Sequence, residues 1–255
     1  MRNQKGQTVL ILILVMTVAL AIGISVIQRS LSDLSASSKV EQSSRAYSAA
    51  EAGIEKAILT NQNINIPVEL GNNAKITEVT TDLLPDDNQA LEYPPLAKEE
   101  LAQVWLANPE TLAKYYDQQE IDIYWGDPDV ADSDTPAIEV TIIYETSAGE
   151  YQSKRYFLDR LANTRKNDFD SSVSCPSDAI QTSLSPTASK TFLCKENIDV
   201  SPTTLPNLSQ LILLRARLLY NNTSQAFAVK PTAGSLPKQA RLYTSTGESG
   251  NTQRK

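Results

Sequence analysis

The run VLILILVMTVALAIGISVI, from Val9 to Ile27, decides how this chain is organised. It contains no charged residue and no proline. At about 1.5 Å per residue, a helix over this run would be about 28 Å long, which matches the hydrocarbon thickness of a bilayer. The run is longer than the apolar part of a secretory signal, and Ser25–Gln28 lacks the small residues of a usual cleavage site. It therefore predicts a transmembrane helix.

The segment before this run is short and basic. Arg2, Lys5 and the amino terminus carry positive charge, and positive flanks tend to stay in the cytoplasm. We therefore expect a single-pass protein with a cytoplasmic amino terminus and most of the chain on the other side of the membrane.

The helical pattern continues beyond the membrane run to Thr60, again without proline. Apolar residues recur mostly at spacings of three, four or seven and are predicted to form an apolar stripe: Leu31, Leu34, Val40, Tyr47, Ile54 and Ile58. The far end of the helix is narrow, so that another backbone can approach it closely, because it carries the small residues Ala46, Ala49, Ala50, Ala52 and Gly53. A stalk or short coiled coil that holds a domain off the membrane would show the same periodicity.

Composition limits the classes of function expected of this chain. The chain has 255 residues, of which 41% are hydrophobic and 21% charged, so one or two globular domains are expected. The net charge is −7 and the basic residues are scattered, so we expect no nucleic-acid partner. Histidine is absent, and no G-x-S-x-G motif is present. We therefore expect a protein that is not an enzyme.

Residues 61–255 are predicted to form a globular α+β domain with a subdivision near residue 165. Strands are predicted at 75–81, 121–125, 137–144, 151–158 and 240–246. Two hairpins are predicted, one pairing 137–144 with 151–158 and the other pairing 211–220 with 225–230. A helix is predicted at 96–107 with a further turn or two at 111–118, loops at 82–95 and 171–209, and a turn at 247–250. Because a return strand should follow Asn251, we expect the native chain to continue past Lys255.

Two groups of residues are candidates for special chemistry. Cys175 and Cys194 are too few for a four-ligand zinc site, and beyond a membrane a pair favours a disulfide over two free buried thiols. The run GDPDVADSD crowds four carboxylates that could hold Ca²⁺: Asp127, Asp129, Asp132 and Asp134. It lacks the glycine and terminal glutamate of an EF-hand, so a solvated acidic loop is the favoured interpretation, and no other cofactor is expected.

Two motifs carry a family resemblance. Lys5-Gly6 followed directly by an apolar helix resembles the prepilin peptidase site of type IV pilins and type II secretion pseudopilins. The run SRAYSAAEAGIEKA, residues 44–57, is similar to the end of the first helix in PilX-type minor pilins. Together the motifs cover residues 5–58, which is under a quarter of the chain.

The resemblance implies a fold and an assembly role. The fold would be α+β, with a long amino-terminal helix packed on an antiparallel sheet. Residues 1–6 would be a leader cut after Gly6, which leaves a methylated Gln7, with 7–28 as the transmembrane half of the helix and 29–60 as its extracytoplasmic half. The partners would be other pilin subunits, the prepilin peptidase and the inner-membrane assembly machinery, and the K-type pseudopilins also bind calcium. Assembly would use Val9, Ile11, Leu14, Leu31, Leu34, Val40, Tyr47 and Ile54.

Two positions depart from the family pattern. Gln7 replaces the apolar residue usual at the first mature position, and Ile11 replaces the glutamate of major pilins at the fifth. The second departure, Ile11, favours a minor subunit over a bulk pilin, and both departures are compatible with a leader that is never cut. They also favour a second hypothesis, an unprocessed single-span surface protein whose globular domain binds a partner or mediates adhesion.

Overall fold

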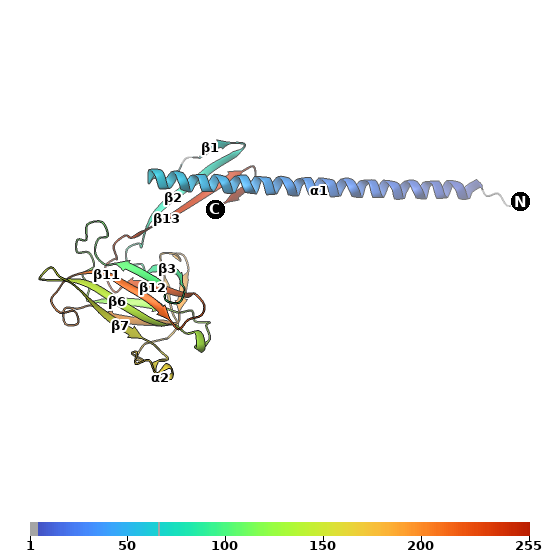
Figure 1. The fold of residues 1–255 in the computed structure, drawn as a ribbon. Coiled ribbons are helices and arrows are strands. Elements are labelled where there is room, and N and C mark those ends of the chain that lie inside the picture. Colours follow the sequence, from blue (N-terminus) through green and yellow to red (C-terminus); the bar gives the residue numbers. More distant parts are fainter. Residues whose placement is uncertain (1–4, 66) are drawn as a thin grey trace. The chain divides into compact units, whose positions relative to one another are not determined.

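The structure is a computed structural model that describes residues 5–65 and 67–255. The chain forms two compact units. One, the helix–sheet unit, contains residues up to 82 together with residues 242–255, and the other, the sandwich unit, contains residues 83–241. Figure 1 shows the elements of each unit along the chain. The division falls at 82/83 and 241/242 rather than near residue 165, which lies in a short helix inside the sandwich unit.

The helix–sheet unit consists of one long helix and one small antiparallel sheet. Helix α1 spans Lys5–Thr60, and the sheet has the order β1-β2-β13-β14. Its strands are β1 (Val68–Gly71), β2 (Ala74–Leu84), β13 (Ala240–Ser249) and β14 (Thr252–Arg254). Asn72 and Asn73 join β1 to β2 with φ values of 49° and 56°, and asparagine tolerates this left-handed conformation in a tight hairpin turn.

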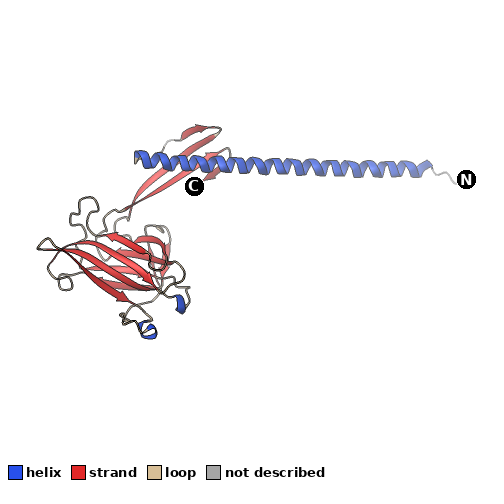
Figure 2. Ribbon diagram, viewed as in Figure 1, coloured by secondary structure: helices blue, strands red, loops and turns tan. Residues whose placement is uncertain are grey.

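The sandwich unit is almost entirely β-structure, as Figure 2 shows. Two four-stranded sheets have the orders β10-β5-β12-β3 and β4-β11-β6-β7, and β8 and β9 form a separate pair. The strands are β3 (Leu91–Leu96), β4 (Leu101–Trp105), β5 (Glu120–Trp125), β6 (Ala137–Thr146), β7 (Tyr151–Leu158), β8 (Asp178–Gln181), β9 (Ser189–Phe192), β10 (Cys194–Asp199), β11 (Leu208–Leu219) and β12 (Gln225–Pro231). A 3-10 turn, η1 (Asp132–Asp134), and the short helix α2 (Ala162–Arg165) lie in the connections.

One hydrophobic core joins the two large sheets. Trp125 and Phe227 come from one sheet, and Val140, Ile142 and Leu214 come from the other, and all five are buried in the same cluster. Strand alternation sends every second side chain inward, so two amphipathic sheets bury their apolar faces against each other. The unit is therefore a β-sandwich, inserted in the sequence between β2 and β13.

Several predicted elements are confirmed, namely the long helix, the strands at 75–81, 121–125 and 240–246, and the hairpin of β6 and β7. The predicted return strand is β14, in which Arg254, Gln253 and Thr252 pair with Gly247, Glu248 and Ser249 of β13. Residues 247–249 are therefore strand, and the turn falls at Gly250 and Asn251.

The helix predicted at 96–107 is wrong, because Leu101–Trp105 form β4 and pair with β11. Ala102 and Val104 are buried, while Leu101 is exposed, so the segment follows the period of a strand. Tertiary pairing overrides the weak local helix preference. The further helical turn predicted at 111–118 is also not formed, and residues 112–118 have no regular secondary structure.

Two other predictions need correction. The loops predicted at 82–95 and 171–209 contain β3 and β8, β9 and β10, respectively. The hairpin predicted around Asn221 and Asn222 does not form, because β11 pairs with β4 and β6, whereas β12 pairs with β3 and β5. The segment around Asn221 therefore crosses from one sheet to the other.

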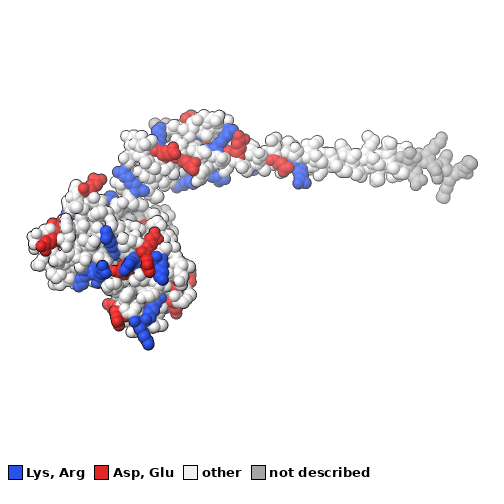
Figure 3. All heavy atoms as spheres, in the orientation of Figure 1, with Lys and Arg blue, Asp and Glu red and all other residues white. Residues whose placement is uncertain are grey.

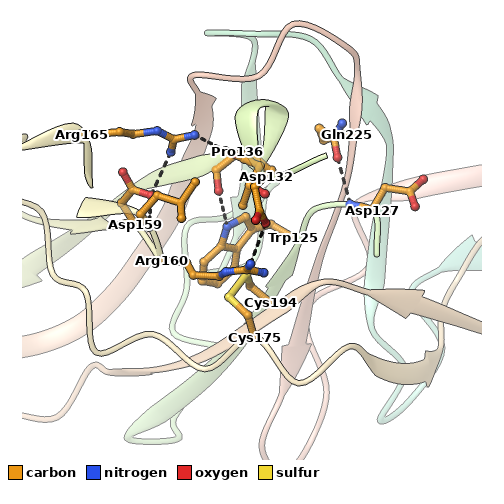
Figure 4. Close-up of a disulfide and its surroundings, with 12 residues drawn as sticks. Trp125, Asp127, Asp132, Pro136, Asp159, Arg160, Arg165, Cys175, Cys194 and Gln225 are labelled. Atoms are coloured by element: carbon orange, nitrogen blue, oxygen red, sulfur yellow. Dashed lines mark hydrogen bonds and ion pairs between the residues drawn. A yellow bond between two sulfur atoms is a disulfide. The ribbon is translucent and has the colours of Figure 1, made fainter. Parts of the chain in front are cut away.

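The predicted disulfide between Cys175 and Cys194 is formed. Cys194 is buried and pairs in register with Trp125 of β5, so the bond lies against the sandwich core, as Figure 4 shows. A nearby contact also fixes the segment that carries Cys175, since Lys195 N donates to Ser174 O at 2.8 Å. The bond ties the long connection after β7 to strand β10.

Removal of this bond should destabilise the sandwich unit. The cysteines are 19 residues apart, and closing a loop of that size contributes about 3 kcal/mol through the entropy of the unfolded chain. Denaturant unfolding of the full chain in detergent, followed by tryptophan fluorescence, reports on this unit, because Trp105 and Trp125 both lie in it. A Cys175→Ser/Cys194→Ala variant should unfold at lower denaturant than the wild type and be insensitive to reductant. Equal midpoints for the oxidised and reduced wild type would contradict this expectation.

Candidate functional site: the long helix and its sheet

The first part of α1 is apolar on all sides. Its most apolar window has a mean hydropathy of 3.0, and none of that window is buried within the structure. Every residue from Val9 to Ile27 is exposed, including Ile11 and Leu14. The hydroxyl of Thr17 donates to Leu14 O at 2.9 Å, so this polar group is satisfied inside the helix. The helix is therefore long and apolar enough to cross a membrane.

The predicted processing site lies at the start of this helix. Gly6 and Gln7 fall in its first helical turn, and the surroundings of the Gln7 side chain lie outside what the structure describes. Met1–Gln4 of the predicted leader also lie outside the described residues.

The last part of α1 buries only small residues against the sheet. The buried positions follow the spacing of one helix face: Ala46, Ala49, Ala50, Gly53 and Ala57. Near the end of the helix, Ala57 packs with Ile76 and Val79 of β2. The narrow face identified in the sequence is confirmed, and the backbone that approaches it is a strand of the same chain.

Two glycines set the closeness of this approach. A Cβ atom built on Gly247 of β13 would overlap the carbonyl of Ala46 and lie 3.0 Å from the Cβ of Ala49. A Cβ atom built on Gly53 of α1 would meet the Oγ of Ser245 and lie 3.0 Å from a methyl group of Val79. Neither position has room for a side chain, so the helix and sheet backbones pack almost directly on each other.

Polar contacts at the rim hold the helix in register on the sheet. Arg45 donates to the carbonyl of Asn72 at 2.9 Å, and Arg254 donates to the hydroxyl of Ser43 at 2.9 Å. Across the sheet, Lys75 lies 3.1 Å from Glu248. A hydrogen bond from Gln253 and, after it, one from Lys75 hold the pKa of Glu248 below its ordinary value. Exposed pairs of this kind stabilise the fold only weakly, so they set the register of the helix on the sheet more than they add to its stability.

The large apolar residues predicted for assembly are left out of this packing. Leu34, Val40 and Tyr47 are 68%, 70% and 56% exposed. Leu31 and Ile58 are also exposed, and Ile54 is half-buried. Val40, Tyr47, Ile54 and Ile58 lie about 100° around the helix from the buried face. Tyr47 and Ile54 also line an open groove of about 350 Å³ beside Tyr243 of β13.

Three of the four carboxylates of the candidate calcium loop have different hydrogen-bond or ion-pair partners. Asp132 lies 2.8 Å from Arg160, and Asp134 accepts hydrogen bonds from Asn222 and Thr223. Asp127 accepts from the backbone N–H of Asp129 at 3.1 Å. Figure 4 shows Asp132 directed at Arg160 and Asp127 beside Gln225.

These contacts give no support to a calcium site. Within residues 5–65 and 67–255, no three His, Cys, Asp or Glu side chains lie close enough together to hold a metal ion. Hydrogen bonds from the Thr223 side chain and the Asn222 backbone hold the pKa of Asp134 below its ordinary value. This carboxylate therefore orders the connection after β11.

Gly247 is the site residue that sequence reasoning missed, since it was assigned to a turn. A glycine inside a strand pattern is itself a signal of close backbone approach, and residues 240–246 already alternated as a strand. Extension of that strand by one residue would have placed Gly247 opposite the small face of the helix.

No known protein family, curated protein or solved structure is significantly similar to this chain. The arrangement itself, a long apolar amino-terminal helix packed on an antiparallel sheet, is consistent with a pilin-like fold.

A Gly247→Ala substitution should loosen the helix from its sheet. The added methyl group would overlap backbone atoms of Ala46 and Ala50, which cannot rotate away, so a loss of about 1–3 kcal/mol is expected. Amide hydrogen exchange of β13 and β14 in the detergent-solubilised chain should accelerate. Gly23→Ala is the control, since nothing lies within 4 Å of that position. Unchanged protection of β13 and β14 in Gly247→Ala would show that the packing is less close than described.

Proposed function

We propose that this chain is a minor pilin-like subunit of a type IV pilus or a related secretion filament. A prepilin peptidase would cut it after Gly6, and it would join the filament through α1. Its amino terminus would lie in the cytoplasm, and the first half of α1 would cross the inner membrane. The sheet of the helix–sheet unit and the whole sandwich unit would lie outside. Its partners would be other pilin subunits and the inner-membrane assembly machinery.

The observation that carries this proposal is that α1 packs on its own sheet through small residues and leaves its large apolar residues exposed. The small residues from Ala46 to Ala57 are buried against the sheet of the same chain, whereas the large apolar residues are exposed. Burial of a Leu or Val side chain is worth about 1.5–3 kcal/mol, so exposed residues of this kind represent unused binding energy. A lipid bilayer satisfies the segment from Val9 to Ile27, and sister helices would satisfy both that segment and the residues beyond it.

The disulfide supports the location outside the cytoplasm, because the bond between Cys175 and Cys194 persists in oxidising compartments. It lies in the sandwich unit, which would then be the part displayed on the outside. Display of this unit for adhesion or for contact at a filament tip fits a minor subunit better than a bulk one.

Of the two departures from the family pattern, Gln7 and Ile11, the second favours a minor subunit. A carboxylate in hydrocarbon is costly unless it is paired, so a helix with Ile11 enters the membrane more easily and gives up a charged contact with a neighbouring amino terminus. The same two residues favour an alternative function, an unprocessed single-span membrane protein whose sandwich unit binds a partner. The compactness of residues 83–241, which form one unit, also favours this alternative.

Intact-mass analysis after co-expression with a prepilin peptidase separates the two functions. The filament subunit should lose Met1–Gly6 and carry a methylated Gln7, because the peptidase acts on the membrane-inserted precursor. A Gly6→Leu variant is the control and should keep its leader. A wild-type chain that keeps its leader under conditions in which a known prepilin is cut would favour the anchored module.

Substitution of exposed apolar residues should block assembly without unfolding the subunit. A Leu34→Ser/Val40→Ser variant changes two exposed side chains, so its stability should stay within about 0.5 kcal/mol of the wild type. Its share in filaments sheared from the source cells should fall sharply, as measured by immunoblot against the membrane fraction. Lys39→Ser, on the same stretch of helix, should assemble normally. Equal incorporation of both variants would count against assembly through this surface.

A further inference from the structure

The outward face of the sheet β4-β11-β6-β7 carries an unusual set of side chains. Strand register places Arg217 of β11 opposite Leu101 and Glu139, and Arg215 opposite Gln103 and Thr141. Thr141 in turn lies opposite Arg155 of β7. Register therefore brings three arginines and one carboxylate to neighbouring positions on the same face. Figure 3 shows basic and acidic side chains together on the visible face of this unit.

Glu139 anchors two of these arginines. Its side chain is buried, with Oε1 3.7 Å from Nε of Arg155 and Oε2 in contact with Nε of Arg217. Each carboxylate oxygen therefore faces a different guanidinium group. A buried carboxylate held in this way orients both arginine side chains, which remain 64% and 45% exposed.

The third arginine is held by a neutral group. Arg215 donates from Nε to Oε1 of Gln103 at 3.3 Å. Arg155, Arg215 and Arg217 carry three positive charges, and Glu139 carries one negative charge, so these four residues together have two positive charges in excess. The chain as a whole has a net charge of −7, so this local excess runs against its overall character.

The same residues line a concave surface. An open groove of about 230 Å³ is bordered by Leu101, Glu139, Thr141, Arg155, Arg215 and Arg217. Guanidinium groups match the geometry of carboxylate and phosphate oxygens, and arginines that are already oriented lose little freedom when they bind. A bound oxyanion would also relieve the repulsion among like charges that are close together.

We propose that this groove binds an oxyanion, a carboxylate or phosphate group that is either free or carried by an acidic sugar. Arg215 and Arg217 would contact it from β11 and Arg155 from β7, with Glu139 positioning the latter two. This site lies within the sandwich unit and does not depend on the proposed filament assembly.

Titration calorimetry on the full chain in neutral detergent tests the site. The probes are inorganic phosphate and glucuronate, with glucose as the uncharged control, all at constant ionic strength. Arg215→Gln should weaken binding about tenfold or more, since a charge-assisted hydrogen bond is lost while both contacts of Glu139 remain. Arg215→Lys keeps the positive charge but not the forked guanidinium group, so its affinity for the probes should fall less than that of Arg215→Gln.

Arg160→Gln is the matched control, because it removes the same charge from the same unit at a residue that pairs with Asp132. Its affinity for the probes should equal that of the wild type. Binding of phosphate indicates a free oxyanion, and binding of glucuronate alone indicates an acidic sugar; either result supports the site if Arg215→Gln weakens it. The proposal is overturned if the wild type binds neither probe, if glucose binds equally well, or if Arg215→Gln binds as tightly as Arg160→Gln.

Discussion

The close packing of α1 on β13 is the constraint on which the rest of this structure depends. Gly247 and Gly53 leave no room for side chains between helix and sheet, so the two backbones lie almost in contact. Small residues bury little apolar area, and the stability of this packing comes from the many close van der Waals contacts that they permit. Small residues at this face also free the large ones for other roles, which is why Val40 and Tyr47 remain exposed.

The sheet also explains how one chain carries two units. β2 and β13 are neighbours in the sheet, and Thr77 of β2 donates to the carbonyl of Thr246 in β13 at 2.8 Å. An insertion between two adjacent strands leaves their pairing intact, and it needs only that the inserted domain begin and end near the same place. Residues 83–241 can therefore form a complete sandwich with its own core and disulfide, while the helix–sheet unit keeps its own packing.

Long periodic elements were predictable from the sequence, and long-range pairings were not. The uncharged run from Val9 to Ile27 and the alternation in β6 and β7 are local signals, and the structure contains the corresponding helix and hairpin. The helix predicted over 96–107 failed because the segment pairs with β11, more than 100 residues away, and distant pairing leaves no trace in a local pattern. The pairing of Cys175 with Cys194 was predictable because the chain contains two cysteines.

The sequence by itself determined that this protein has a membrane-length apolar helix, a narrow small-residue face at its far end and antiparallel strands in the remainder. These properties follow from periodicity and composition, which can be read from a short stretch of sequence. Only the tertiary structure decided that a strand of the same chain occupies the narrow face, that β11 and β12 belong to different sheets, and that Arg155, Arg215 and Arg217 lie on one face with Glu139. Each of these depends on strand register between distant segments, which is set by the total burial of both sheets rather than by any one segment.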